Sequence, residues 1–145
     1  MAGRTFLDTN ILVYLVDGGH PAKQAAARRA FDELEPGSVV LSTQVLQEFH
    51  WNATRKLVPP MPTAAAARFV LDLSAHRVVT VDVPLILAAI SRTTSDPVDF
   101  WDALILEAAL EAGCDRLYSE DFQHGRLFGA LQVVNPLRAS ARGSG

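Results

Sequence analysis

TFLDTN, residues 5–10, sets a short apolar run directly against the start of a helix. Thr5-Phe6-Leu7 has the composition of a buried strand. The run stops at Asp8-Thr9-Asn10, where an Asp or Thr side chain can cap a helical segment over residues 11–16. This stretch therefore predicts a strand whose carboxyl end carries an acid and leads at once into a helix.

The rest of the chain continues this alternation of short strands and helices. We predict strands at residues 39–41, 78–81, 116–118 and 132–134, and helices at about 21–34, 43–56, 63–76, 82–94 and 99–112. Residues 93–98 and 125–129 are expected to form loops. Because parallel strands need crossover connections, the order indicates an α/β fold, a three-layer α/β/α sandwich with a central, mostly parallel sheet.

Length and composition are those of one ordinary globular domain. The chain has 145 residues, of which 49% are hydrophobic and 20% charged. We assign residues 1–137 to one domain and expect residues 138–145, which are small and polar, to form a flexible tail. No apolar run approaches the roughly 20 residues of a membrane span, no signal-peptide pattern precedes residue 5, and the single Cys114 excludes an internal disulfide. These features predict a cytoplasmic protein without membrane contact.

Four acids that lie far apart in the sequence are expected to meet at one edge of the sheet. Asp8 directly follows the first strand, and Asp121 lies three residues beyond the fourth. Glu48 and Asp102 lie early in helices that begin at the same edge. Binding sites in parallel sheets form beyond the carboxyl ends of the strands, so this edge is the predicted site.

The surroundings of the four acids predict a metal ion. Asp102 lies in FWDALIL (100–106), a helical segment that is apolar nearly all round and therefore mostly buried, and Glu48 borders an apolar stripe. Carboxylates buried near one point would repel one another unless cations are present. Oxygen ligands without paired His or Cys select Mg²⁺, with Mn²⁺ as the alternative. Magnesium held in this way suits phosphodiester hydrolysis by a metal-activated water.

Four short motifs carry a resemblance to a known family. They are FLDTN (6–10), QEF (47–49), FWDALI (100–105) and LYSEDF (117–122). In this order they resemble the acidic motifs of PIN-domain nucleases, and most closely those of the VapC toxins of bacterial toxin–antitoxin pairs. The resemblance implies a PIN-like nuclease domain over residues 1–137 that acts as a Mg²⁺-dependent endoribonuclease. It further implies an RNA substrate, a homodimer, and inhibition by a VapB-type antitoxin whose tail occupies the cleft.

The resemblance also implies roles for residues beside the acids. Three polar side chains match positions that support the acids in that family: Thr9, Asn10 and Ser119. Two further acids are alternatives for an auxiliary role, Asp99 one turn before Asp102 and Glu120 next to Asp121. We rank Asp121 above Glu120 as a ligand and expect Asp99 to cap its helix.

Structural roles remain open for several of these residues. Taken alone, Asp8 would be a helix cap and Asp102 a partner of the helix dipole. His20 and the other three histidines have no metal-ligand spacing and are expected on the surface or in loops. Trp51 and Trp101 could stack on bases, although Trp101 within an apolar helix is expected in the core.

Two other functions fit parts of the pattern. A catalytically silent PIN-like module that binds RNA or protein would be favoured by the loss of a motif acid, and none is missing. A phosphatase or phosphotransferase would use Asp8 as a covalent nucleophile. Asn10 stands where such an Asp-x-Asp motif needs its second acid, and no suitable lysine follows Asp121, so we rank this function last.

Overall fold

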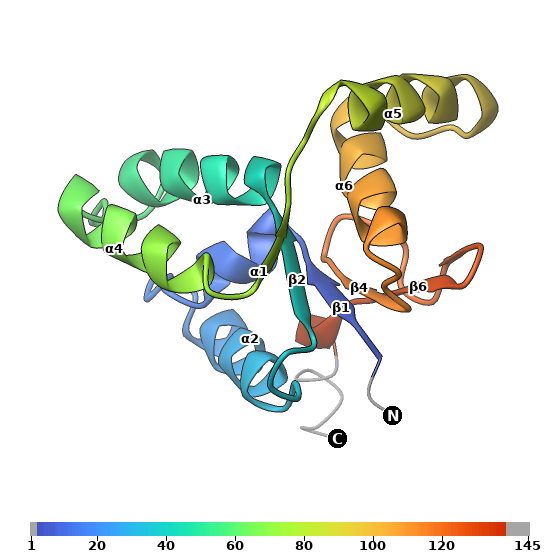
Figure 1. The fold of residues 1–145 in the computed structure, drawn as a ribbon. Coiled ribbons are helices and arrows are strands. Elements are labelled where there is room, and N and C mark those ends of the chain that lie inside the picture. The colour runs from blue at the N-terminus through green and yellow to red at the C-terminus, as the bar shows by residue number, and fades with distance from the viewer. Residues whose placement is uncertain (1–2, 139–145) are drawn as a thin grey trace.

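A six-stranded sheet between two layers of helices forms the centre of the computed structural model, which describes residues 3–138 (Figure 1). The strand order is β3-β2-β1-β4-β6-β5. Five strands run parallel: β1 (Thr5–Leu7), β2 (Val39–Ser42), β3 (Arg77–Val79), β4 (Arg116–Tyr118) and β6 (Leu131–Val134). The short β5 (Leu127–Phe128) runs antiparallel to β6. The predicted three-layer α/β/α fold with a mostly parallel sheet is confirmed.

The helices divide between the two faces of the sheet. On one side lie α1 (Thr9–Tyr14), α2 (Pro21–Asp32), α3 (Thr43–Arg55) and α4 (Thr63–Leu73), and on the other lie α5 (Val83–Ser95) and α6 (Phe100–Glu111). Crossovers between parallel strands are right-handed. The chain moves outward from β1 to β2 and β3, then returns past β1 to β4, and this reversal of direction puts α5 and α6 on the opposite face.

The reversal makes the boundary between β1 and β4 the switch point of the sheet. Leu7 pairs with Tyr118 there, and the backbone N–H of Asp8 donates to the Tyr118 carbonyl at 2.9 Å. In open α/β sheets a crevice forms where neighbouring strands send their connections to different faces. The ends of β1 and β4 are therefore the expected position for a ligand site.

Polar side chains start the helices at this edge, as the sequence predicted. Asp8, Ser42, Asp82 and Asp99 are the N-cap residues of α1, α3, α5 and α6, and each side chain accepts a backbone N–H of its own helix. The hydrophobic core lies behind them. All three residues of β1 are buried, and α6 is buried over most of its length.

Three details differ from the sequence-based expectations. The strand β5 lies in a segment expected to be a loop, because Gly129, at φ 61°, allows a tight turn that pairs two residues with β6. Helix α5 continues into the expected loop to Ser95, where Arg92 pairs with Asp96 and with Glu107 of α6. The third strand ends at Val79, since the Val81 N–H donates to the Thr43 hydroxyl instead of to a strand.

Two further expectations concern the tail and membranes. Arg138 belongs to a short helical turn at residues 136–138, and the remainder of the expected tail, residues 139–145, lies outside the described residues. Within residues 3–138, no helix is long and apolar enough to span a bilayer.

Replacement of Leu106 by Ala tests the central place of α6 in the core. Leu106 is fully buried, so Leu106→Ala should lower the free energy of unfolding by about 2–5 kcal/mol, through lost burial and a residual cavity. Urea denaturation measures this change. The control is Leu71→Ala on α4, where the side chain is 63% exposed and the change should stay within about 0.5 kcal/mol. Equal losses in both variants would contradict this assignment of the core.

Candidate active site

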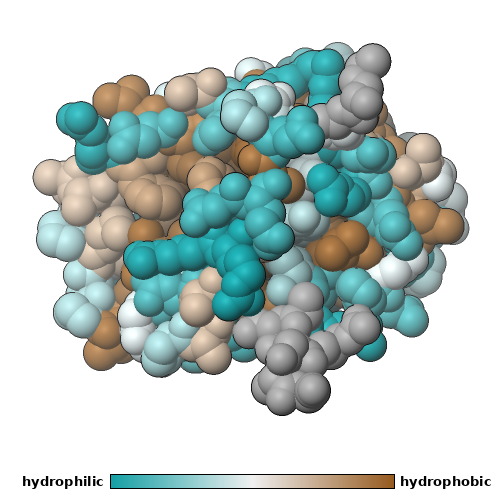
Figure 2. Space-filling model, turned by 90° about the horizontal axis from the view of Figure 1, so that it is seen from below, coloured by the Kyte–Doolittle hydropathy of each residue, from teal (hydrophilic) through white to brown (hydrophobic). Residues whose placement is uncertain are grey.

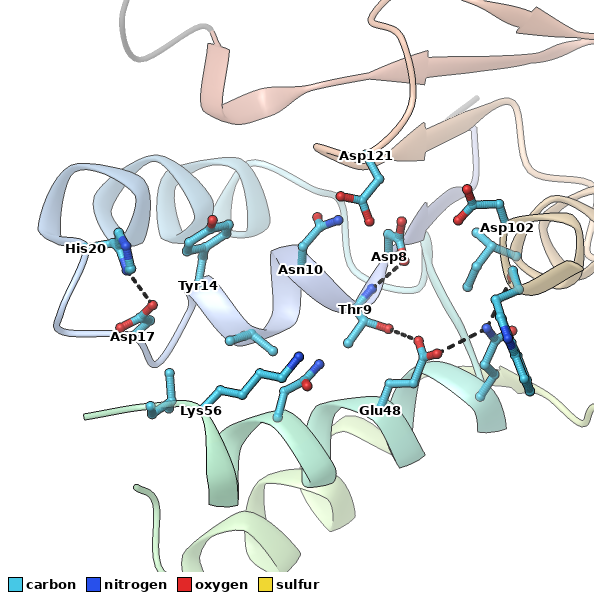
Figure 3. Close-up of a pocket in the computed structure, with 16 residues that line it drawn as sticks. Asp8, Thr9, Asn10, Tyr14, Asp17, His20, Glu48, Lys56, Asp102 and Asp121 are labelled. Atoms are coloured by element: carbon cyan, nitrogen blue, oxygen red, sulfur yellow. Dashed lines mark hydrogen bonds and ion pairs between the residues drawn. The ribbon is translucent and has the colours of Figure 1, made fainter. Parts of the chain in front are cut away.

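The four acids predicted from the sequence line one cavity of about 470 Å³ at the carboxyl edge of the sheet. Asp8, Glu48, Asp102 and Asp121 point toward one another from four separate segments of the chain (Figure 3). Asp8 follows β1, Glu48 lies on α3, Asp102 lies in the first turn of α6, and Asp121 follows β4. The fold therefore brings together residues that are up to 113 positions apart (121 − 8).

Asp8 is the most enclosed of these acids, with 4% of its surface exposed. Its Oδ1 accepts the Thr9 N–H at 2.7 Å, and its Oδ2 accepts the Ser119 hydroxyl at 2.7 Å. The same Ser119 oxygen accepts the backbone N–H of Asp121 at 3.0 Å. One fully buried serine thus fixes Asp8 and the start of the Asp121 loop relative to each other.

Glu48 is held by one side chain from α1 and one from its own helix, α3. Its Oε1 accepts the Thr9 hydroxyl at 2.7 Å, and its Oε2 accepts Gln44 Nε2 at 3.4 Å. The same Gln44 amide donates to the Trp101 carbonyl at 3.2 Å, immediately before Asp102. Gln44 and Glu48 lie one turn apart on α3. Through Gln44 this helix therefore connects Glu48 to the backbone next to Asp102.

Asp102 and Asp121 are the more accessible acids. Asp102 is half-buried, and its backbone N–H donates to Asp99 at 2.8 Å. Asp99 therefore caps α6, as expected. Asp121 is exposed at the mouth of the cavity.

Burial and mutual repulsion raise the pKa of two of these carboxyl groups. Burial raises the pKa of Asp8 to about 7 against the opposing effect of its two hydrogen bonds, and Asp121 and Asp102 add repulsion. Burial also raises the pKa of Asp102 to about 6, with added repulsion from Asp99, Asp121 and Glu48. The cavity holds more negative charge than its surroundings stabilise.

The expected supporting residues fall into two groups. Thr9 and Ser119 bind motif acids directly, and Asn10 lines the cavity while its Oδ1 accepts the Glu120 N–H at 3.3 Å. Glu120 itself turns to a different cluster. Its carboxylate accepts Tyr14 Oη at 2.9 Å and pairs with Lys23 at 2.7 Å, which ties the loop after β4 to α1 and α2.

Sequence reasoning missed six cavity residues: Tyr14, Asp17, His20, Gln44, Asn52 and Lys56. For three of them a signal was present, because Gln44, Asn52 and Lys56 lie at intervals of four from Glu48 along one helical face. His20 lies at the far end of the cavity with Nδ1 2.7 Å from Asp17 Oδ2. The position of His20 depends on the turn between α1 and α2, and the spacing of residues in the sequence does not indicate the path of this turn.

Oxygen atoms dominate the potential ligands in this cavity. Among the residues that the structure describes, no three His, Cys, Asp or Glu side chains are gathered closely enough to hold an ion as they stand. The acids nevertheless line a common cavity, and two atoms of other lining residues, Asn10 Nδ2 and Gln44 Oε1, are buried without a hydrogen-bond partner. A hard divalent cation could be held by Asp8, Glu48, Asp102 and Asp121, and its charge would offset their repulsion.

The chain is similar to one protein family and to several solved structures. The model of the PIN domain family matches residues 5–127. No curated protein matches by sequence. VapC20 of Mycobacterium tuberculosis, a sarcin-ricin loop cleaving toxin, is 24% identical with a TM-score of 0.67, over 81% of this chain and 89% of that chain.

Two further structures show the same degree of likeness. A toxin–antitoxin complex from Klebsiella pneumoniae is 19% identical with a TM-score of 0.70, over 91% of this chain and 97% of that chain. FitAcB from Neisseria gonorrhoeae is 17% identical with a TM-score of 0.64, over 91% and 97%. At these identities the likeness shows a common fold.

The raised pKa of Asp8 predicts how the stability of the metal-free protein depends on pH. Between the unfolded value of 3.8 and the folded value of about 7, the folded chain binds more protons than the unfolded chain. The free energy of unfolding should therefore fall as pH rises through this window, by at most about 1.4 kcal/mol per pH unit for this group. Asp8→Asn should reduce the slope and be more stable than the wild type at about pH 7.5.

Thermal unfolding in EDTA across this pH range measures the effect. Asp72→Asn is the matched control, because the Asp72 side chain is 69% exposed and its loss should leave the wild-type pH dependence unchanged. Parallel curves for Asp8→Asn and the wild type would show that the buried carboxyl is not the source of the slope.

Proposed function

The chain belongs to the PIN domain family, and from this premise we propose that it is a metal-dependent endoribonuclease, the toxin component of a type II toxin–antitoxin system. The observation that carries the proposal is the meeting of Asp8, Glu48, Asp102 and Asp121 in one cavity at the switch point of the sheet. Such a set of acids has little use in a purely structural role, because burial raises the pKa of Asp8 and of Asp102 and the neighbouring acids raise both further.

The proposed cofactor is Mg²⁺, or Mn²⁺ in its place, with Asp8, Glu48, Asp102 and Asp121 as the ligands. When bound, the ion would supply an activated water and stabilise negative charge at the scissile phosphate. The residues of the chain do the positioning. Ser119 and the Thr9 N–H fix the Asp8 carboxylate, and the Thr9 hydroxyl fixes Glu48.

The other end of the cavity has groups suited to the substrate. Among the described residues that line the cavity, Lys56 is the one Lys or Arg. Its ammonium group can contact a phosphate. Asn52, one turn before Lys56 on α3, can donate or accept hydrogen bonds with a base.

An antitoxin protein is the proposed regulatory partner. The support is that solved structures of this fold include toxin–antitoxin complexes. A separate groove on the chain is lined by five apolar and four polar or charged residues: Leu15, Val16, Phe31, Phe69 and Leu73, with Arg28, Asp32, Asp72 and His76. Figure 2 shows hydrophobic side chains gathered toward the left of that view, the side on which α4 lies in Figure 1. A hydrophobic segment of a partner would find a complementary surface in such a groove.

A homodimer is the proposed assembly. Helix α5 presents Val83, Leu87 and Ile90 with 66%, 59% and 48% of their surface exposed. Their spacing of four and three residues places them on one face of the helix, and burial against a second copy would remove this apolar face from water.

A silent PIN-like binding module is the second candidate. The observation in its favour is that no three of the described acids lie close enough to hold an ion as they stand. The two candidates differ in one respect that can be measured, namely cleavage that depends on added metal.

Cleavage of RNA tests the proposed activity. Purified protein without antitoxin should cut total RNA at discrete positions in Mg²⁺, and EDTA should abolish the cuts. Asp8→Asn should reduce the rate at least about 100-fold, since it removes one proposed ligand. Glu111→Gln, at the exposed far end of α6, is the control and should retain the wild-type rate. Cleavage that persists in EDTA and in Asp8→Asn would overturn the metal mechanism.

Metal binding has a second readout that does not depend on cleavage. Millimolar Mg²⁺ or Mn²⁺ should raise the melting temperature of the wild type, because the ion binds the folded state alone. The increase should be smaller in Asp102→Asn. An equal increase in both proteins would place the ion elsewhere.

Replacement of Leu87 tests the proposed homodimer. Leu87→Glu puts a charge on the exposed face of α5 and should shift the protein from dimer to monomer in sedimentation equilibrium. Leu71→Glu, at an equally exposed position on α4, should remain dimeric. A dimer that survives Leu87→Glu would exclude this face.

A further inference from the structure

Both tryptophans of the chain lie exposed in one groove. Trp51 and Trp101 retain 55% and 61% of their accessible surface, contrary to the sequence-based expectation that Trp101 lies in the core. They line the groove together with Gln47, Glu48, Asn52 and Lys56. The core expectation is wrong because the apolar face of α6 begins at Ala103, and Trp101 in its first turn projects beyond the packed part of the helix. Two large exposed aromatic residues in one groove indicate a binding surface.

The tryptophan groove is continuous with the carboxylate cavity. The two share Glu48, Asn52, Lys56 and Trp101 as lining residues. Trp101 directly precedes Asp102 in the sequence, and Trp51 lies three residues after Glu48 on α3. Each aromatic ring therefore lies within one helical turn of a proposed metal ligand.

Neighbouring groups hold the two rings and add positive charge. The Arg55 guanidinium lies 3.7 Å from the centre of the Trp51 ring, so one face of this ring is covered by a cation. Phe100 packs edge-on against Trp101 at 5.1 Å between ring centres, and Gln44 binds the Trp101 carbonyl. Lys56 lies on the wall that the groove shares with the cavity.

We propose that the tryptophan groove binds single-stranded nucleic acid by stacking bases on Trp101 and Trp51, and so leads the strand into the carboxylate cavity. The direction of the strand rests on the proposed nuclease function, whereas the stacking itself does not. Aromatic faces beside cations are the combination that binds single strands, because every base has a face that can stack and every phosphate carries a charge. Stacking also explains how a chain of net charge −3 without a basic stripe would hold RNA.

Tryptophan fluorescence gives a direct test, because the chain has two tryptophans and both line the groove. The probe is an oligouridylate of about 12 nucleotides, whose bases are free to stack on protein. The experiment uses the full chain with Asp8→Asn in Mg²⁺, so that binding is measured without cleavage. Each single-tryptophan protein, carrying Trp51→Phe or Trp101→Phe, should show saturable quenching.

The affinities of variants distinguish base stacking from electrostatic attraction to the phosphates. Trp101→Ala should weaken binding roughly 10-fold or more, and Trp101→Phe should restore most of the affinity. Leu71→Ala on α4 is the control and should bind as the parent does. Trp101→Ala should leave the slope of the logarithm of the binding constant against the logarithm of salt concentration unchanged. Lys56→Ala should reduce this slope by about the amount that one phosphate contact contributes. An oligomer of abasic ribose phosphates should not quench.

Three results would overturn the proposal. The first is unchanged affinity in Trp51→Ala and Trp101→Ala, and the second is equal quenching by the abasic oligomer. The third has two parts: tryptophan emission changes with protein concentration in the absence of RNA, and Trp101→Ala abolishes the dimer. The last result would assign the groove to a second copy of the chain. Quenching without any metal-dependent cleavage by the wild type would support the groove and overturn the nuclease proposal, so the two failures are distinguishable.

Discussion

The buried hydrogen bond from Ser119 to Asp8 is the contact on which the rest of the site depends. Parallel pairing of β1 with β4 brings Leu7 beside Tyr118, and the next residue of each strand then meets across the switch point. Because the Ser119 oxygen also accepts the Asp121 N–H, the first and fourth acidic motifs have one common anchor. Thr9 extends the anchor to Glu48, and Gln44 extends it to the backbone before Asp102. A strand pairing, five hydrogen bonds and two helix starts thus fix acids that share no local sequence.

The same arrangement buries a carboxyl group at a cost to the stability of its ionised form. Asp8 is desolvated and receives two hydrogen bonds, yet burial outweighs them and its pKa remains raised. Lys23 does not relieve this charge, since it pairs with Glu120 on the far side of the loop. Burial raises the pKa of Asp102 as well, and repulsion from Asp99, Asp121 and Glu48 raises it further. The cavity therefore keeps an excess of negative charge, because Lys23 is engaged with Glu120 and Lys56 lies toward the tryptophan groove.

Periodicity and capping were enough to predict the layers, the parallel sheet and the edge where the acids meet. Predicted helix ends fell within three residues of those found, because Asp8, Ser42, Asp82 and Asp99 mark the starts in the sequence itself. Features that depend on tertiary contact were missed. The two-residue β5 has no period to detect, Trp101 is exposed because α6 extends past its packing partners, and His20 reaches the cavity through a turn. Glu120 and Asp121 are neighbouring acids beyond β4, and a strand-end position does not specify which of the two side chains turns into the cavity.

The burial of Asp8 also has an evolutionary consequence. Because burial raises the pKa of Asp8, its ionised form stabilises the folded chain less than its neutral form does, and a neutral residue of the same shape is expected to suit the fold at least as well. A relative that no longer needs the carboxylate could therefore carry asparagine at position 8 and remain a well-folded protein.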